Sequence, residues 1–247
     1  FYWGKGGNEM SFTDVIAQGC FTWNIPLPEG ALEGLEEYTR LLLEKNQVMN
    51  LTAITEPDQV AVRHMLDCLF QLSCGDFEGK RVIDIGSGGG FPGIPLQIAR
   101  PSARFLLLDS RKKRVDFLQE VCDAMGLPAE TMAGRAEEAA WQKQLREKFD
   151  IAVSRAVAPM NILCELCLPF VRPGGLFLAM KSQNEGAEQE IQGAQKAIRT
   201  LGGRLKEQRS YQLPGTDVHH QVVVIEKVKN TPPAYPRRYA KIESAPL

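Results

Sequence analysis

Two acidic residues and a cluster of glycines have the types and the spacing of a ligand-binding site. One acid lies inside a short apolar run that the glycines follow, and the other acid ends a second apolar run. The first run and its glycines read Arg81-Val-Ile-Asp-Ile-Gly-Ser-Gly-Gly-Gly-Phe-Pro-Gly-Ile-Pro95, and the second ends Phe105-Leu-Leu-Leu-Asp109. Asp84 lies inside an apolar run, where a carboxylate is costly unless donors bond to it. The glycines permit a sharp turn or the close approach of a ligand, and the prolines suit the first turn of a helix. A strand, a glycine turn and a helix start together form the ligand-binding corner of many α/β folds.

The glycines fit two patterns. Residues 88–93 match the G-x-G-x-x-G fingerprint of dinucleotide-binding enzymes. Residues 84–90 match D-x-G-x-G-x-G, the pattern of S-adenosylmethionine-dependent methyltransferases, in which the acid takes the cationic amino group of the methionine moiety. A pyrophosphate on a helix N-terminus needs no adjacent carboxylate, so Asp84 favours the methyltransferase pattern. Asp109 does not discriminate, because an acid ending the second strand binds ribose hydroxyls in both classes.

The composition is that of an ordinary globular protein. Of 247 residues, 44% are hydrophobic and 24% charged, and the net charge of −1 means that any nucleic-acid binding needs a local basic patch. No apolar stretch is long enough to span a bilayer and no signal-peptide pattern is present, so we expect a cytoplasmic protein without membrane contact. The six cysteines are expected to be free thiols, and Cys164 and Cys167 to lie in the core of a helix rather than on a metal.

The element pattern predicts one structural unit in four parts. Residues 1–9, which precede Met10, are an extension or a cloning remnant. Residues 10–79 form an N-terminal helical cap, with a first helix from Ser11 ended by Gly19, a second over about 28–49 and a third opening near residue 56. Residues 80–228 alternate strands and helices, which is typical of a doubly wound parallel sheet. Residues 229–247 form a basic, proline-containing tail whose run 232–236 is expected to stay extended.

The last two predicted strands decide between the cofactors. Residues 204–213 and 219–228 are joined by so short a turn that they must form an antiparallel hairpin. A parallel sheet closed by such a hairpin is the Rossmann-like arrangement of class I S-adenosylmethionine-dependent methyltransferases. Binding of a dinucleotide at the glycine turn therefore becomes the minor alternative to binding of S-adenosylmethionine.

The motifs resemble those of the bacterial small-subunit ribosomal RNA guanine-N7 methyltransferase family, called GidB or RsmG. The resemblance covers residues 10 to 240 and includes a Phe-Pro-Gly-Ile-Pro run that general methyltransferases lack. The matching segments are Asn50-Leu-Thr-Ala-Ile-Thr55, Arg63-His-Met-Leu-Asp67, residues 84–95, Leu108-Asp-Ser110, Lys113-Arg-Val-Asp-Phe-Leu118, Gly134-Arg-Ala-Glu137, Val153-Ser-Arg-Ala156, Met180-Lys181 and Asn230-Thr-Pro-Pro-Ala-Tyr-Pro-Arg237.

The resemblance implies roles for individual residues. Gly86 and Phe91 would line the cofactor, Ala136 and Glu137 would bracket its adenine, and Arg155 would reach into the site. The expected cofactor set is Asp84, Gly86, Ser87, Gly88, Phe91, Asp109, Ser110, Ala136, Glu137 and Arg155. The expected catalytic candidates are Arg155, Lys181 and His64. The expected RNA-binding set is Arg63, His64, Arg111, Lys112, Lys113, Arg114, Lys181, Arg237 and Arg238, with Lys241 beside them in the tail.

Guanine N7 has an in-plane lone pair and no proton, so its methylation needs alignment with the sulfonium methyl rather than a general base or a metal. The expected substrate is an accessible guanine of 16S ribosomal RNA or of the small ribosomal subunit, the product S-adenosylhomocysteine, and the enzyme a monomer. The base must be single-stranded or flipped out of its stack. Two other classes remain at this stage: a methyltransferase of a small molecule or protein, and a non-catalytic RNA-binding protein.

Overall fold

The central element is one seven-stranded sheet with the strand order β3-β2-β1-β4-β5-β7-β6. The computed structural model describes residues 10–247, so the prediction for residues 1–9 lies outside the described residues. The strands are β1 (Arg81–Ile85), β2 (Arg104–Asp109), β3 (Glu130–Ala133), β4 (Phe149–Arg155), β5 (Val171–Ser182), β6 (Gly203–Gln212) and β7 (His219–Lys227). Strands β1 to β5 pair in parallel, and β7 pairs antiparallel with both β5 and β6. The predicted fold class is confirmed, including the closing hairpin.

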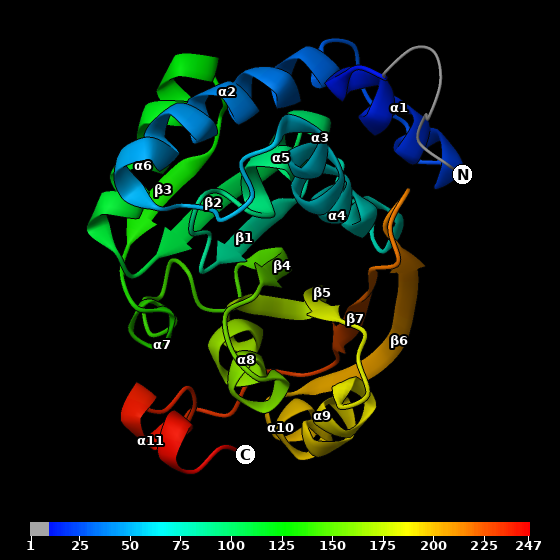
Figure 1. Ribbon diagram of the computed structural model, residues 1–247. Coiled ribbons are helices and arrows are strands. Elements are labelled where there is room, and N and C mark those ends of the chain that lie inside the picture. The colour runs from blue at the N-terminus through cyan, green and yellow to red at the C-terminus, as the bar shows by residue number, and fades with distance from the viewer. Residues whose placement is uncertain (1–9) are drawn as a thin grey trace.

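Helices cover both faces of the sheet, as Figure 1 shows. Alternate strand residues face opposite ways, so that Val82 belongs to one core and Ile83 to the other. On the Val82 face lie α1 (Phe12–Thr22), α2 (Ala31–Met49), α5 (Gly93–Ala99), α6 (Lys112–Met125) and an unbroken helical run of α3 (Pro57–Val60), the π-helical η1 (Ala61–Leu66), α4 (Asp67–Leu69) and η2 (Phe70–Ser73). On the Ile83 face lie α7 (Ala136–Ala139), α8 (Met160–Cys167), η3 (Leu168–Phe170), α9 (Ala187–Gly193), α10 (Gln195–Thr200) and α11 (Tyr239–Ser244).

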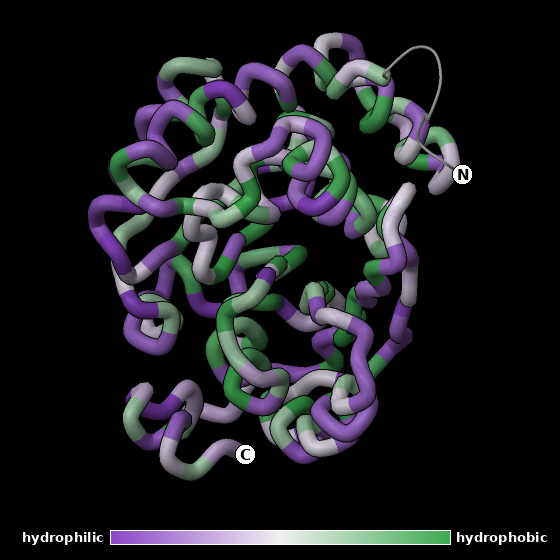
Figure 2. Tube along the Cα trace, in the orientation of Figure 1, coloured by the Kyte–Doolittle hydropathy of each residue, from purple (hydrophilic) through white to green (hydrophobic). Residues whose placement is uncertain are grey.

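The hydropathy pattern agrees with this three-layer arrangement. Helices such as α2 alternate between hydrophobic and hydrophilic residues along their length, as expected for one buried and one solvated face (Figure 2). All six cysteines are free and buried, and Cys164 and Cys167 lie in the core of α8 as predicted. Among the helices of residues 10–247, none is long and apolar enough to cross a membrane.

Two local predictions were wrong. Gly19 does not end the first helix but lies buried inside α1, where a Cβ would stand 2.5 Å from a methyl of Leu66. Glycine is therefore needed there for close helix packing rather than as a stop. The tail does not remain extended: it turns after Pro232, whose carbonyl accepts the N–H of Tyr235 at 3.0 Å, and then forms α11.

Candidate active site

The glycine corner follows β1 and is held by backbone and carboxylate contacts. The N–H groups of Gly86 and Ser87 donate to the carbonyl of Leu108 at the end of β2, at 2.8 and 3.1 Å. One oxygen of Asp84 accepts the N–H of Gly93, the first residue of α5, at 2.9 Å. Asp84 is fully buried, and its other oxygen has no hydrogen-bond partner within the described chain. Burial raises the pKa of this carboxyl to about 7.

A second carboxylate holds the same loop from β2. Asp109 accepts the N–H of Gly88 at 2.9 Å and the N–H of Arg111 at 2.8 Å, and a guanidinium nitrogen of Arg114 lies 3.7 Å from it. Gly86 and Gly88 have φ angles of +76° and +58°, which glycine adopts without strain.

The corner fits a ligand that carries a cation and sugar hydroxyls. The unpaired oxygen of Asp84 leaves a buried acceptor that an ammonium group would satisfy. Each carboxylate oxygen has more than one lone pair, so Asp109 retains capacity for a hydroxyl beyond its two backbone donors. Ser110 is exposed directly after β2. Ala136 and Glu137 open α7 after β3, and the buried Glu137 carboxylate pairs with Arg135.

The loop after β4 lies over the glycine corner. Ala156 has a φ of +56°, and the methyl Cγ2 of Val157 lies 2.5 Å from the position that a Cβ on Gly86 would occupy. The loop therefore packs against Gly86 and leaves the Cβ side of Gly88 open.

Arg155, the last residue of β4, belongs to a buried polar network. Its guanidinium donates to Asp67 at 3.1 Å and to Nδ1 of His64 at 3.0 Å, and it lies 4.6 Å from the centre of the Phe91 ring. Nε2 of His64 lies 2.7 Å from the hydroxyl of Thr52. Burial and the neighbouring Arg155 charge lower the pKa of His64 to about 4, so the ring is neutral near pH 7. Arg155 and His64 were both predicted site residues, and the structure brings them together.

Asp67 extends this network to the antiparallel hairpin. One of its oxygens accepts the Tyr211 hydroxyl at 2.7 Å and lies 2.6 Å from Nδ1 of His220. Burial of the carboxyl opposes ionisation, but the His220 hydrogen bond and the Arg155 charge outweigh it and lower the pKa of Asp67. The carboxylate is therefore ionised and fully bonded.

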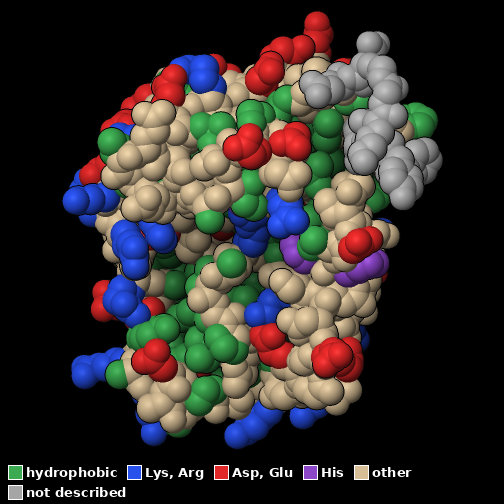
Figure 3. Space-filling model, in the orientation of Figure 1, with side chains coloured by type: hydrophobic (Ala, Val, Ile, Leu, Met, Phe, Trp, Pro, Cys, Tyr) green, Lys and Arg blue, Asp and Glu red, His purple; other side chains and the backbone are tan. Residues whose placement is uncertain are grey.

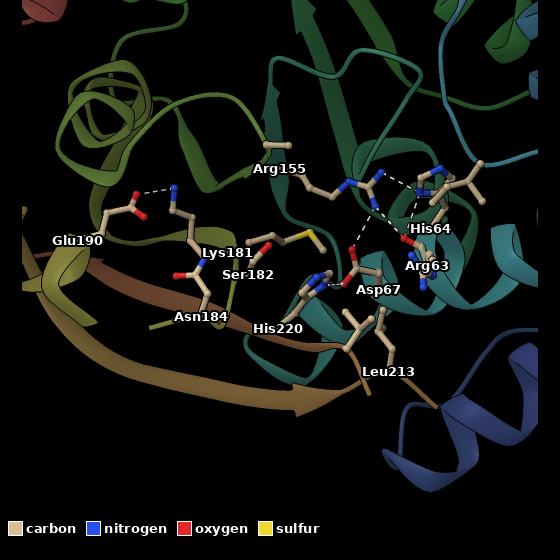
Figure 4. A pocket seen from close by; sticks show the side chains of 14 residues that line it. Arg63, His64, Asp67, Arg155, Lys181, Ser182, Asn184, Glu190, Leu213 and His220 are labelled. Carbon is tan, nitrogen blue, oxygen red and sulfur yellow. Dashed lines mark hydrogen bonds and ion pairs between the residues drawn. The ribbon is translucent and has the colours of Figure 1, made fainter. Parts of the chain in front are cut away.

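A cavity of about 440 Å³ opens beside Arg155, at the carboxyl ends of β4 and β5. Figure 4 shows its lining, and Figure 3 shows basic, acidic and histidine side chains gathered in the middle of this face. Lys181 lines the cavity at the end of β5, where it donates to the Ala158 carbonyl at 3.0 Å and pairs with Glu190 at 2.6 Å. The lining residues that carry charge or can hydrogen-bond through their side chains are Arg63, His64, Asp67, Arg155, Lys181, Ser182, Asn184, Glu190 and His220.

The predicted RNA-binding residues are not all free to bind phosphate. Arg63 is exposed at the cavity. Arg111, Lys112 and Lys113 are exposed at the start of α6, although Lys112 pairs with Asp116, and the half-buried Arg114 lies near Asp109. Arg238 and Lys241 are exposed in the tail.

Arg237 differs from the other predicted RNA-binding residues. Its guanidinium is bound by the buried carboxylate of Glu165 in α8, with nitrogen–oxygen distances of 2.6 to 3.2 Å. This pair anchors the tail to α8 and engages the Arg237 charge within the protein.

Comparison with known proteins identifies the family. The family model described as GidB, rRNA small subunit methyltransferase G, matches residues 31–215. The chain belongs to the GidB family. It is 44% identical over 241 residues to ribosomal RNA small subunit methyltransferase G of Alkaliphilus oremlandii, covering 96% of this chain and 100% of the relative. It is 45% identical over 244 residues to the protein of the same name from Lachnoclostridium phytofermentans, covering 96% and 98%. The resemblance inferred from the motifs is thus confirmed.

The fold extends beyond the GidB family. The branched-chain polyamine synthase from Thermus thermophilus, solved with N4-aminopropylspermidine and 5'-methylthioadenosine, superposes with a TM-score of 0.62 at 15% identity. The match covers 87% of this chain and 70% of the synthase, and it shows a shared fold only.

Sequence reasoning missed five polar residues of the cavity lining as functional candidates: Asp67, Ser182, Asn184, Glu190 and His220. They lie on α4, at the end of β5, in the loop after it, on α9 and on β7, and no single local motif connects them. The available signals concerned Asp67, which ends the segment Arg63–Asp67 and is an acid among the apolar residues Leu66, Cys68 and Leu69. In residues 10–247 no cluster of three or more His, Cys, Asp or Glu could hold a metal ion.

Proposed function

We propose that this protein transfers a methyl group from S-adenosylmethionine to N7 of one guanine in 16S ribosomal RNA. The observation that carries the proposal is the juxtaposition of the glycine corner, with its unpaired Asp84 oxygen, and the polar cavity that Arg155 lines beside it. The relatives named rRNA small subunit methyltransferase G support the substrate class.

The cofactor supplies an electrophilic methyl group when bound. Asp84 would bind its ammonium group, the backbone of Gly86 and Gly88 would line it, and Asp109 and Ser110 would receive its ribose hydroxyls. Ala136 and Glu137, at the end of the neighbouring strand β3, would flank the adenine. These residues follow three adjacent parallel strands, so they lie along one edge of the sheet.

The protein's own task is alignment. Arg155 is fixed by Asp67 and His64 and its guanidinium lies over the Phe91 ring, so it forms a rigid side wall where the corner meets the cavity. A base in the cavity would thereby present N7 toward the corner, and fixing this geometry removes much of the entropic barrier to in-line displacement. Lys181, already paired with Glu190, would help to orient the nucleotide rather than move a proton.

The RNA would follow the exposed cations around this opening. Arg63, Arg111, Lys112, Lys113, Arg114, Arg238 and Lys241 are the proposed contacts. Phosphate contacts of this kind make affinity sensitive to salt. We further propose that the protein acts as a monomer in the cytoplasm, where its substrate is made.

The test is methyl transfer from radiolabelled S-adenosylmethionine to unmodified small-subunit RNA, naked and as assembled particles, mapped by cleavage at N7-methylguanine. One labelled guanine is the expected result. Labelling of a small molecule or protein instead, with none in RNA, would support the alternative methyltransferase class. Failure to bind the cofactor would contradict the proposal altogether.

A further inference from the structure

The cavity and the glycine corner meet at Arg155, which lines the cavity and lies over Phe91 of the corner. The corner belongs to β1 and β2, whereas the far wall of the cavity is formed by residues at the adjoining ends of β5 and β7. If N7 of the target guanine points toward the corner, as the proposed function requires, the opposite edge of the base points toward β5 and β7. That edge carries the N1–H and N2 amino donors, so its recognition requires an acceptor.

His220 offers such an acceptor at the start of β7. Its Nδ1 lies 2.6 Å from the ionised Asp67 carboxylate, which only accepts, so Nδ1 carries the proton. In the neutral ring the lone pair is then on Nε2. No group in residues 10–247 hydrogen-bonds to Nε2 of His220, although the residue lines the cavity and its side chain is only 23% exposed (Figure 4).

The ring is held from several elements. The Tyr211 hydroxyl of β6 donates to the same Asp67 oxygen at 2.7 Å, and Arg155 of β4 donates to the other at 3.1 Å. The negative charge of Glu190, the other acidic group of the cavity, is paired with Lys181 at 2.6 Å, and the same carboxylate oxygen accepts the N–H of Met160 at 2.7 Å. His220 is therefore a preoriented acceptor that the internal network leaves open.

We propose that His220, positioned by Asp67, accepts a hydrogen bond from N1–H of the target guanine through Nε2. This inference rests on the proposed function. Methylation at N7 gives the base a positive charge, which makes N1–H a stronger donor, so the bond strengthens as the charge develops and favours the transition state over the ground state. Adenine presents a lone pair at N1, so the same contact rejects it.

Two variants separate the two nitrogens of His220. His220→Asn keeps an amide near the Nδ1 position, facing Asp67, and removes the Nε2 acceptor. His220→Gln places an amide oxygen near the Nε2 position. We expect His220→Asn to lower kcat/KM on small-subunit RNA at least about tenfold, mainly through kcat, and His220→Gln to lower it less. His219→Asn, on the exposed neighbouring residue, is the matched control and should behave like wild type.

A modified RNA supplies an independent measurement with wild-type protein. An RNA bearing 1-methylguanosine at the mapped position lacks the N1–H donor. Wild type should methylate this RNA at least about tenfold more slowly than the unmodified RNA. The His220→Asn variant should methylate both RNAs at similar rates, because it already lacks the acceptor to which N1–H would bond.

The outcomes distinguish the two proposals. An inactive wild type refutes the proposed function itself. If the wild type is active and the His220→Asn variant is unimpaired, the role of His220 is overturned. The same holds if the His220→Asn variant is active and the His220→Gln variant is inactive, because only the hydrogen bond to Asp67 would then matter. An equal loss from 1-methylguanosine in wild type and His220→Asn also overturns it.

Discussion

At the scale of single residues, the most informative feature is a buried carboxylate with a hydrogen-bond partner on only one of its two oxygens. Asp84 was predicted from its place inside an apolar strand, and the structure shows one of its oxygens bonded and the other unpaired. Such a carboxyl destabilises the protein once it ionises and gains stability from a bound cation. The cofactor's ammonium group is the cation that the proposed function brings there.

Asp84→Asn tests this directly. The folded pKa of about 7 lies above the ordinary 3.8, so the stability contributed by this group is present below pH 3.8 and is lost as the pH rises through 7. Without cofactor at pH 8, the variant should melt about 2 °C or more above wild type. It should also bind S-adenosylmethionine at least about tenfold more weakly by calorimetry. Unchanged affinity would remove Asp84 from the cofactor site.

His64 has the opposite pH dependence. Its folded pKa of about 4 is below the ordinary 6.5, so the unfolded chain takes up the proton first and stability falls as the pH drops from 6.5 to 4. His64→Gln, which keeps an amide near Thr52, should lack this loss. In denaturant titrations the wild type should therefore lose up to about 3 kcal/mol relative to the variant across this window. If the difference in unfolding free energy between wild type and variant did not change with pH, the His64 ring would not be buried in its neutral form.

The sequence could predict those site residues that stand in a local motif, and not those that meet only through the fold. Asp84 is the penultimate residue of β1 and Asp109 the last residue of β2, and the apolar residues around them indicate both strands. Asp67 and His220 are 153 residues apart, and only the placement of β7 beside β5 brings them within 2.6 Å. The family resemblance supplied Arg155 and His64, but it did not show that they bond to each other.

At the scale of elements, strands were easier to predict than helix ends. Buried parallel strands appear as apolar runs with β-branched residues, and all seven predicted strands exist. The role of Gly19 and the extended run 232–236 were wrongly predicted, because tertiary contacts decide both. Leu66 excludes any side chain at Gly19, and Ile242 of α11 is fully buried in the core on the Ile83 face.

The contact between the β4 loop and the glycine corner predicts a coupled pair. Gly86→Ala should cost about 1–2 kcal/mol of folding free energy from its positive φ alone, with an added cost from the clash with Val157. In the Gly86→Ala background, Val157→Ala should remove the cost of the clash but not the cost of the positive φ. A double-mutant cycle by chemical denaturation should therefore give a coupling energy above about 0.5 kcal/mol, and strict additivity would show that the loop does not rest on Gly86.

At the scale of the whole molecule, the near-zero net charge requires that RNA binding come from a local basic patch. Lys113→Gln should weaken RNA binding and reduce the slope of log affinity against log salt by about 1. The control variant Arg237→Gln removes the same charge and should leave the salt slope of RNA binding unchanged. It should instead lower the free energy of unfolding by about 3 kcal/mol, because it leaves the buried Glu165 carboxylate without its partner. Identical slopes for wild type and Lys113→Gln would exclude Lys113 from the RNA path.

The edges of the sheet support the proposed monomer. β3 has four residues, and the longer edge strand β6 carries Arg204, Lys206, Glu207 and Arg209 and a bulge between Leu205 and Glu207. Charges and bulges on an edge strand oppose pairing with a second copy. Light scattering after size exclusion should give the monomer mass of 27.4 kDa, and a dimer that persists on dilution would contradict this prediction.

The strand order also sets an order of events in time. β6 pairs with no strand except β7, while β7 pairs with both β6 and β5, so β6 joins the sheet only through a strand that is made after it. Until β7 exists, the open side of β5, with Phe177, Leu178 and Ala179, has no strand to cover it. We therefore expect the β6–β7 hairpin to form from its own local contacts and to dock on β5 as a unit, which covers the apolar edge of the parallel half.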